Sequence, residues 1–267
     1  MNEPDQKPPL AWQPFTPRGV AAFGRAPAGR VLVVQLVLAL VIAGVVVWFL
    51  RGDWYPVVTR AVNALPEEGA IRNGRLDWAG APAAILGEDR YLAVVVDLYH
   101  SGTARSPAHV QVELSREGFR VYSLFGFVQG RYPVDREVAF NRVALVPWWG
   151  AWAPPSLAVV ALGVVAGLMM TWCCLATLYL VPVWLIGFFG DRECTLGRSW
   201  RLAGAALMPG AALMTAGLVG YGVGALDVIH LVLVGALHVV VPWFYLAASP
   251  WCLPRQARAQ VKENPFA

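Results

Sequence analysis

The sequence predicts an α-helical integral membrane protein with four transmembrane helices and a small, mainly β (α+β) extracytoplasmic domain between the first two helices. Three observations lead to this fold class: four long apolar stretches, arginines at their ends, and alternating apolar and polar residues between the first two stretches. Each stretch is long enough to cross a hydrocarbon core of about 30 Å at about 1.5 Å per residue. The stretches are Val31–Leu50, Leu157–Phe189, Leu202–Tyr221 and Leu226–Ala248.

The composition supports a membrane protein and argues against a nucleic-acid-binding one. Hydrophobic residues make up 57% of the chain and charged residues only 14%, whereas soluble domains contain about 25% charged residues. The net charge is +4, and positively charged residues cluster beside the apolar stretches. Orientation in a bilayer explains this placement. The segments expected in the cytoplasm are short and lack a basic and aromatic array, so we expect a lipid bilayer and no nucleic acid as partner.

The four cysteines, Cys173, Cys174, Cys194 and Cys252, all lie outside the long polar segment 51–155. A disulfide framework in an oxidising compartment would place them inside it. Their spacing does not match a metal site. We therefore expect no metal and no cofactor.

The N-terminal segment 1–30 is expected to be a cytoplasmic leader. It is rich in proline as far as Pro17, which predicts disorder at its start. Val20–Arg30 is expected to form either a plain flexible lead or a short helix on the inner membrane surface. The first apolar stretch is longer than the core of a signal peptide, which is about 7–15 residues. It ends without a small-x-small cleavage site, so we expect it to remain as an anchor.

The positive charges predict one orientation. The turn 222–225 carries none, whereas the leader, the segment after the second stretch and the tail carry several. The positive-inside rule then places both termini and the loop 190–201 in the cytoplasm, with 51–155 outside a bacterial inner membrane. The predicted division is 1–30 leader, 31–50 first helix, 51–155 outer domain, 156–189 second helix, 190–201 loop, 202–221 third helix, 226–248 fourth helix and 249–267 cytoplasmic tail.

The outer domain has the pattern of a small antiparallel sheet. Asn73-Gly74 lies between matched apolar and basic residues, which is a strong signal for a two-residue hairpin. Tyr91–Leu98 is β-branched and predicts a buried strand, while His109–Leu114 alternates between apolar and polar residues. A turn at 115–118 is expected to use Gly118 in a left-handed conformation. Further predicted elements are a helix at Pro56–Leu65 and strands at Phe119–Phe125 and Val138–Val146.

Four residues near one strand end are weak candidates for chemistry. Asp97, Tyr99, His100 and His109 would need to converge to form a metal or acid–base site. Solvated loop residues are the favoured interpretation. The chain contains no catalytic motif of the G-x-S-x-G, H-E-x-x-H or phosphate-loop type, so we expect no enzyme.

The second apolar stretch is longer than one crossing requires. We expect a span over Leu157–Val181, a kink at Pro182 and an interfacial segment to Phe189. Pro209 is expected to break the third helix. Pairs of small residues four apart predict close helix packing within the chain, with a homodimer as the alternative. These pairs are Gly163 and Gly167, Ala206 and Gly210, and Ala39 and Ala43.

The candidate binding residues lie in the fourth helix. Asp227, His230 and His238 share one helical face, and ionisable groups inside a bilayer are costly enough to suggest a function. Asp227 and His238 are about 16 Å apart along the axis, which excludes one metal bound by both. The alternatives are a helix cap at Asp227 with a hydrogen-bonding His238, or a proton or substrate path. Gln35 is a candidate polar partner.

The order of parts resembles a known family. Five parts follow one another along the chain. They are a leader with Phe15-Thr16-Pro17, one span, Leu65-Pro66 followed by the Asn-Gly hairpin, a strand ending in Val95-Val96-Asp97, and a helix bundle beginning with Ser199-Trp200-Arg201. This order is similar to bacterial multipass proteins grouped loosely with the Yip-type membrane proteins, which often have four or more C-terminal helices instead of three.

The resemblance implies a non-enzymatic accessory or scaffold role and supplies no catalytic residues. We therefore expect an accessory, scaffold or sensing component whose outer domain binds a protein partner in the membrane or envelope. The alternative is a small transporter or channel-like subunit that uses Asp227, His230 and His238.

Overall fold

The computed structural model describes residues 11–256. The chain divides into two compact units, which are described separately here. The helical unit contains the chain up to Val45 and from Leu162 onward, and the sheet unit contains Val46–Ala161. Two long helices, α2 (Ala28–Phe49) and α4 (Arg142–Phe189), contribute residues to both units.

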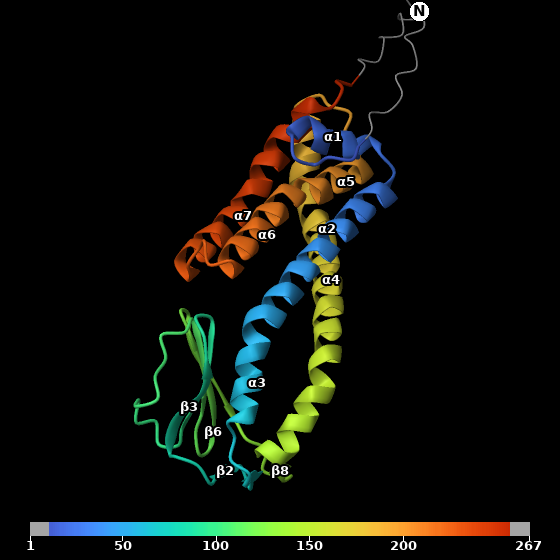
Figure 1. The fold of residues 1–267 in the computed structure, drawn as a ribbon. Coiled ribbons are helices and arrows are strands. Elements are labelled where there is room, and N and C mark those ends of the chain that lie inside the picture. The colour runs from blue at the N-terminus through green and yellow to red at the C-terminus, as the bar shows by residue number, and fades with distance from the viewer. Residues whose placement is uncertain (1–10, 257–267) are drawn as a thin grey trace, which may run out of the picture. The chain divides into compact units, whose positions relative to one another are not determined.

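Within the described residues, four helical segments are long and apolar enough to cross a membrane, as the sequence predicts. Figure 1 shows α6 and α7 as an antiparallel pair, with α1 and α5 close to the C-terminal end of α7. The remaining elements are α1 (Pro17–Arg25), α5 (Leu196–Ala206), α6 (Met208–Gly222), α7 (Val228–Ala248) and the 3-10 turn η2 (Ser249–Cys252).

The third apolar helix is divided into α5 and α6 at Leu207, two residues before Pro209. Proline lacks an N–H group and its ring clashes with the preceding turn, so the predicted break is confirmed. α5 begins at Leu196, earlier than expected, because the Thr195 side chain caps it by accepting from the Arg198 amide at 3.4 Å. Most of α5 is buried, which makes it the central helix of this unit.

Small residues let the helices approach α5 and α6 closely. A Cβ atom on Gly204 would stand 3.2 Å from both Val31 and Gln35 of α2. The Gln35 side chain is 2% exposed and donates to the Gly204 carbonyl at 3.2 Å. Gly210 lies against the backbone of α7, so the predicted close packing is confirmed there.

The other predicted glycine pair behaves differently. No atom outside the local helix backbone lies within 4 Å of where a Cβ would stand on Gly163 or Gly167. The prediction of close packing within the chain is therefore wrong for this pair. α4 is also one continuous helix through Pro182, longer than the expected span.

The part of the leader that the structure describes is packed on the helical unit. α1 buries Val20 and Phe23 against the core, which contains Leu202 and Leu253. Tyr245 of α7 donates to the Phe15 carbonyl at 2.8 Å. The helix predicted within Val20–Arg30 therefore forms at Pro17–Arg25, and its apolar side faces protein. The expected disorder at the start, and most of the tail, lie outside the described residues.

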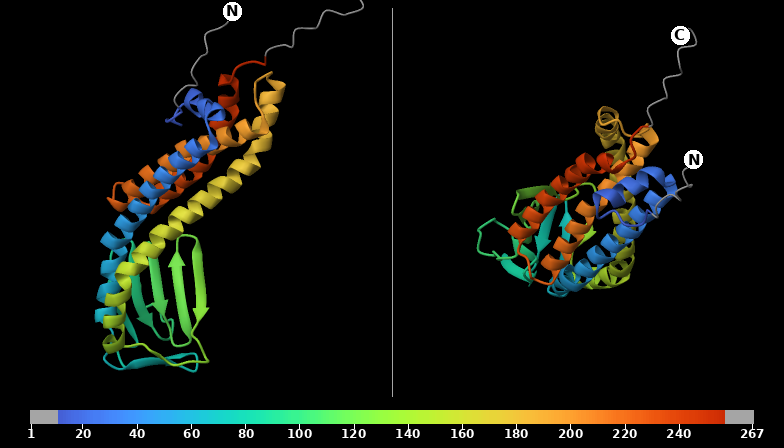
Figure 2. Two further views of the ribbon diagram at one scale, coloured as in Figure 1. Left: turned by 90° about the vertical axis from the view of Figure 1, so that its right-hand side faces the viewer. Right: turned by 90° about the horizontal axis from the view of Figure 1, so that it is seen from above.

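The sheet unit contains two sheets, with strand orders β2-β1-β8 and β3-β4-β5-β6-β7. Figure 2 shows the strands of the larger sheet side by side in its left-hand view. The strands are β1 (Gly69–Arg72), β2 (Arg75–Trp78), β3 (Ala83–Glu88), β4 (Leu92–Asp97), β5 (Val110–Leu114), β6 (Gly118–Ser123), β7 (Gly126–Arg131) and β8 (Val138–Ala139).

The predicted turn conformation is confirmed at Asn73-Gly74 and is wrong at Gly118. Asn73 and Gly74 have φ values of 51° and 73°, as a two-residue primed turn between β1 and β2 requires. Gly118, in contrast, is not among the described residues with positive φ. Its lack of a side chain serves close approach, because a Cβ there would stand 2.2 Å from the Gly130 carbonyl oxygen.

The sheet differs from the expected antiparallel one in three respects. β4 and β5 pair in parallel, so the larger sheet is mixed. β3 and β7, at its two edges, were not predicted. The strand expected at Val138–Val146 ends at Ala139, and helix α4 begins at Arg142. The Asn141 side chain causes this change by accepting from the Ala144 amide at 2.9 Å, which caps the helix.

The predicted short helix is confirmed as α3 (Tyr55–Asn63), which continues α2 through a π-helical turn at Leu50–Trp54. α3 packs on one side against β3 and β4. On the other side it meets the start of α4, where Trp149 donates to Thr59 at 2.9 Å and Tyr55 hydrogen-bonds Ser156 at 2.7 Å. Ala61 of α3 packs with Leu65, Leu86 and Val96 in one of the core clusters of the sheet unit.

Candidate functional site

The three candidates on the fourth helix do not form one site. Asp227 is the N-cap of α7, and its carboxylate accepts from the His230 amide at 2.8 Å. The His230 ring lies 2.9 Å from the same carboxylate oxygen, and both side chains are substantially exposed. His238 lies farther along the helix and contacts the carbonyl of Gly235 in its own helix. The capping interpretation of Asp227 is therefore confirmed.

His238 lines an apolar cavity of about 300 Å³ between α2, α4, α6 and α7. Neither Asp227 nor His230 contributes to its wall. Gln35, expected as a partner for this face, instead donates to Gly204. Among residues 11–256, no three His, Cys, Asp or Glu side chains are arranged to hold a metal ion.

The sheet unit contains a second group of polar residues, organised by Asp97 at the end of β4. Asp97 is 1% exposed, whereas the sequence suggested a solvated loop residue. Its two carboxylate oxygens accept from the amides of Ser101 at 2.9 Å and Gly102 at 2.7 Å. Burial raises the pKa of Asp97, but these hydrogen bonds to the carboxylate outweigh burial, so the pKa lies below its ordinary value.

The loop that Asp97 anchors presents His100 with a positive φ of 54°. The His100 ring nitrogen Nδ1 lies 2.5 Å from Glu113 of β5, whose side chain is only 7% exposed. Gln111 on the same face is also buried, and it accepts from the Ser106 amide and donates to the Ala104 carbonyl. The polar face of β5 is thus the more buried one, because the loop after β4 covers it.

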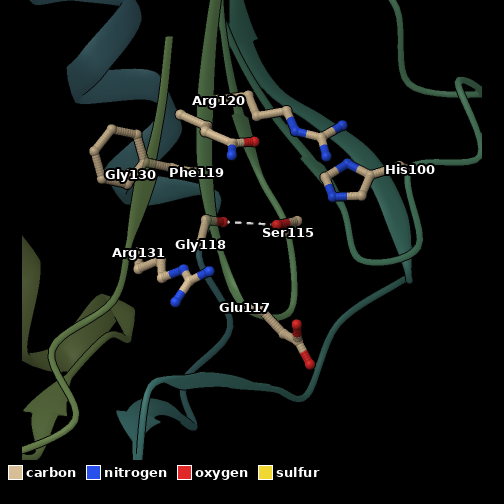
Figure 3. Close-up of a pocket in the computed structure, with 9 residues that line it drawn as sticks. His100, Ser115, Glu117, Gly118, Phe119, Arg120, Gly130 and Arg131 are labelled. Atoms are coloured by element: carbon tan, nitrogen blue, oxygen red, sulfur yellow. Dashed lines mark hydrogen bonds between the residues drawn. The ribbon is translucent and has the colours of Figure 1, made fainter.

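Beside the contact between His100 and Glu113 lies a pocket of about 210 Å³, which we call the β6–β7 pocket. Figure 3 shows the Arg120 side chain extending towards the His100 ring, with Arg131 and Glu117 on other sides of the pocket. Phe119 packs over Gly130, where a Cβ would stand 2.4 Å from its ring. The wall is formed by His100, Ser115, Glu117, Gly118, Phe119, Arg120, Gln129, Gly130 and Arg131.

The β6–β7 pocket adjoins an open sheet edge. β7 is the last strand of the sheet, and all but one of its residues are exposed. Phe127 is 58% and Val128 72% exposed, and Phe125 in the turn before β7 is 83% exposed. The arrangement therefore offers unpaired backbone groups, apolar side chains and two arginines on adjacent strands, which suits binding of an extended peptide.

The sequence alone did not indicate this site. The turn residues Leu124 and Phe125 belong to an apolar run that predicted a strand, yet they form the tip of the β6–β7 hairpin. The signal available was Gly126, whose φ of 110° permits the turn. Comparison with protein-family models, curated proteins and solved structures found no match to this chain.

Proposed function

We propose that the chain is a non-enzymatic protein of the bacterial inner membrane, an accessory, scaffold or sensing component. Its four apolar helices cross the bilayer, both termini lie in the cytoplasm, and the sheet unit lies outside. The sheet unit binds an extended segment of a protein partner at the β7 edge. The observation that carries the partner role is the exposed strand β7 beside the β6–β7 pocket.

Surface chemistry supports the membrane location. α2, α4 and α7 expose many large apolar side chains, for example Val37 at 57%, Leu162 at 71% and Leu233 at 61%. Such a surface would be costly in water, at roughly 25 cal/mol per Å² of apolar area. Hydrocarbon removes this cost, because lipid tails are as apolar as these side chains.

The orientation is supported by charges that gather at one end of the helical unit. Arg192 after α4 forms a β-bridge with Arg255 after η2. Arg201 of α5 donates to the carbonyl of Gly24 in α1 at 2.8 Å. Three segments far apart in the sequence therefore share one positively charged end, which the positive-inside rule assigns to the cytoplasm.

Reporter fusions test the orientation. Fusions that end after Glu117 and after Glu193 should report opposite sides of the membrane, because the two positions flank one span. Reporters on the same side would contradict the proposed arrangement.

Photocrosslinking tests the partner site. A photoreactive amino acid at Val128 on the open edge should crosslink one protein in intact cells. The matched probe at Ile85, which is 44% exposed on β3, should give none. Phe127→Lys should abolish the Val128 crosslink, because an edge lysine blocks strand addition. Equal crosslinking from both edges would contradict the proposal.

A second candidate function is a small transporter or channel-like subunit. The cavity of about 300 Å³ beside His238 favours it, because intramembrane titratable groups occur along substrate and proton paths. His238→Phe should then abolish transport in proteoliposomes. His230→Phe should have little effect, since His230 lies outside the cavity. An unchanged flux in His238→Phe would exclude this candidate.

A further inference from the structure

A cavity with two arginines in its wall lies in the helical unit, between α1 and the C-terminal turn η2. We call it the basic groove, and its volume is about 480 Å³. It joins residues from both ends of the described chain, so it exists only when α1 is docked on the bundle. Its walls are Arg18, Ala21, Ala22, Arg25, Trp251, Cys252 and Leu253.

The α1 side of the groove follows helical geometry. Arg18, Ala21, Ala22 and Arg25 are at positions i, i+3, i+4 and i+7, which share one face of a helix. The two arginines are therefore about 10.5 Å apart along the axis, at about 1.5 Å per residue. The alanines between them leave space that longer side chains would fill.

The two guanidinium groups are exposed, and no hydrogen bond or ion pair is recorded for either of them within residues 11–256. No carboxylate lines the groove in the described part of the chain. The nearby Glu193 pairs instead with Arg198 at 3.0 Å. The groove thus has two positive charges that the described protein does not neutralise.

The opposite wall is held in place by another arginine. Arg192 donates to the Leu253 carbonyl at 2.9 Å and lies over the Trp251 ring at 5.7 Å. α1 is held by Arg201, which donates to the Gly24 carbonyl through two nitrogens at 2.8 and 3.3 Å. The groove is therefore organised before a ligand binds, which lowers the entropy cost of binding.

We propose that the basic groove binds the phosphate of an anionic phospholipid headgroup. Arginine favours phosphate because its planar donors match the phosphate oxygens. Trp251 is 56% exposed, and an exposed indole favours the headgroup layer. Basic pockets on the cytoplasmic side recognise such headgroups. The inference rests on the proposed membrane location and adds a ligand class to it.

Thermal unfolding of the full chain in nanodiscs tests the proposal. Nanodiscs of phosphatidylcholine are compared with nanodiscs that also contain phosphatidylglycerol. The anionic lipid should raise the unfolding midpoint by about 3 °C at concentrations near ten times its Kd. Arg18→Gln/Arg25→Gln should lose this rise. The matched variant Arg116→Gln/Arg136→Gln, in the sheet unit, should keep it. An equal midpoint in both lipid mixtures for the unmodified chain would overturn the proposal.

Alkylation of Cys252 provides a readout independent of stability, because this cysteine is exposed in the groove. A water-soluble maleimide should modify Cys252 about tenfold more slowly with the anionic lipid at ten times its Kd. Mass spectrometry of the peptide separates Cys252 from the other cysteines. No protection in the unmodified chain, or equal protection in Arg18→Gln/Arg25→Gln, would overturn the proposal.

A control with a soluble phosphate compound distinguishes a lipid headgroup from free phosphate as the ligand. Glycerol phosphate, added at the same concentration, should give neither the midpoint rise nor the protection of Cys252. Equal effects would show a site for soluble phosphates and would overturn the lipid assignment. Extraction of the chain from membranes by alkaline carbonate tests the membrane location separately, so the two failures are distinguishable.

Discussion

The two edges of the five-stranded sheet differ sharply, although they belong to one small domain. At the β3 edge, α3 covers the strand so closely that a Cβ on Gly87 would stand 2.7 Å from the Val57 carbonyl oxygen. At the β7 edge, Phe127 and Val128 are exposed. An open edge invites strand addition, and proteins normally protect it. The covered edge therefore serves stability, and the open edge is available for binding.

The largest expected effect is at Asp97, at the end of β4, which pairs with the covered edge strand β3. Asp97→Ala should destabilise the sheet unit by about 3 kcal/mol, because it removes the acceptor for two amides and a hydroxyl. Hydrogen exchange of the full chain should then show opening of the β4 region about 100-fold more frequently. Asp135→Ala, at an exposed position, is the control and should change nothing. Unchanged hydrogen exchange of the β4 region in Asp97→Ala would contradict this prediction.

The same residue predicts a pH dependence. The pKa of Asp97 is lowered in the folded state, so its contribution is present above the unfolded pKa of about 3.9. That contribution should be lost as the pH falls through the lower folded pKa. The loss should be smaller than for Asp97→Ala, because a protonated carboxyl still accepts hydrogen bonds. Unfolding midpoints measured from pH 5 downward should fall more steeply for the unmodified chain than for Asp97→Ala.

A backbone contact at the covered edge should have an intermediate effect. Gly87→Ala should cost about 2 kcal/mol, since the new Cβ meets the backbone of α3 and forces it to shift. Gly150→Ala is the matched control, because nothing lies within 4 Å of its Cβ position and alanine favours a helix. Chemical denaturation of both variants checks the prediction. Equal stability of the two would show that α3 does not constrain this edge.

The smallest effect on stability is expected at the open edge. Val128→Lys should change the free energy of unfolding by less than about 0.5 kcal/mol, because Val128 is 72% exposed. Copurification of the proposed partner should nevertheless be lost. A large drop in stability would show that β7 contributes to folding, and would remove the distinction between the edges.

Features encoded locally could be predicted from the sequence. Asn73-Gly74 specifies its hairpin because few other residues accept positive φ at both positions. The four apolar helices are equally clear, because their composition alone marks them. β3 and β7 could not be predicted, since they lack a regular alternation of apolar and polar residues and each contains glycine.

Features that depend on distant segments could not be predicted. Gln111 and Glu113 look like the solvent side of β5, yet the loop after β4 covers them. The parallel pairing of β4 with β5 also joins strands in a way that no local signal specifies. The β6–β7 pocket depends on both features, because His100 reaches it only from that loop.

The bond from Gln35 to Gly204 also bears on how the protein is made. The two residues are 169 positions apart, so a ribosome synthesises α2 long before the acceptor exists. In a bilayer, the Gln35 amide would meanwhile lack a partner of its own chain, which is unfavourable in hydrocarbon. If α2 crosses a membrane as proposed, we expect it to reach its final depth and rotation late in biogenesis. Until then, we expect water, lipid headgroups or the insertion machinery to hydrogen-bond this side chain.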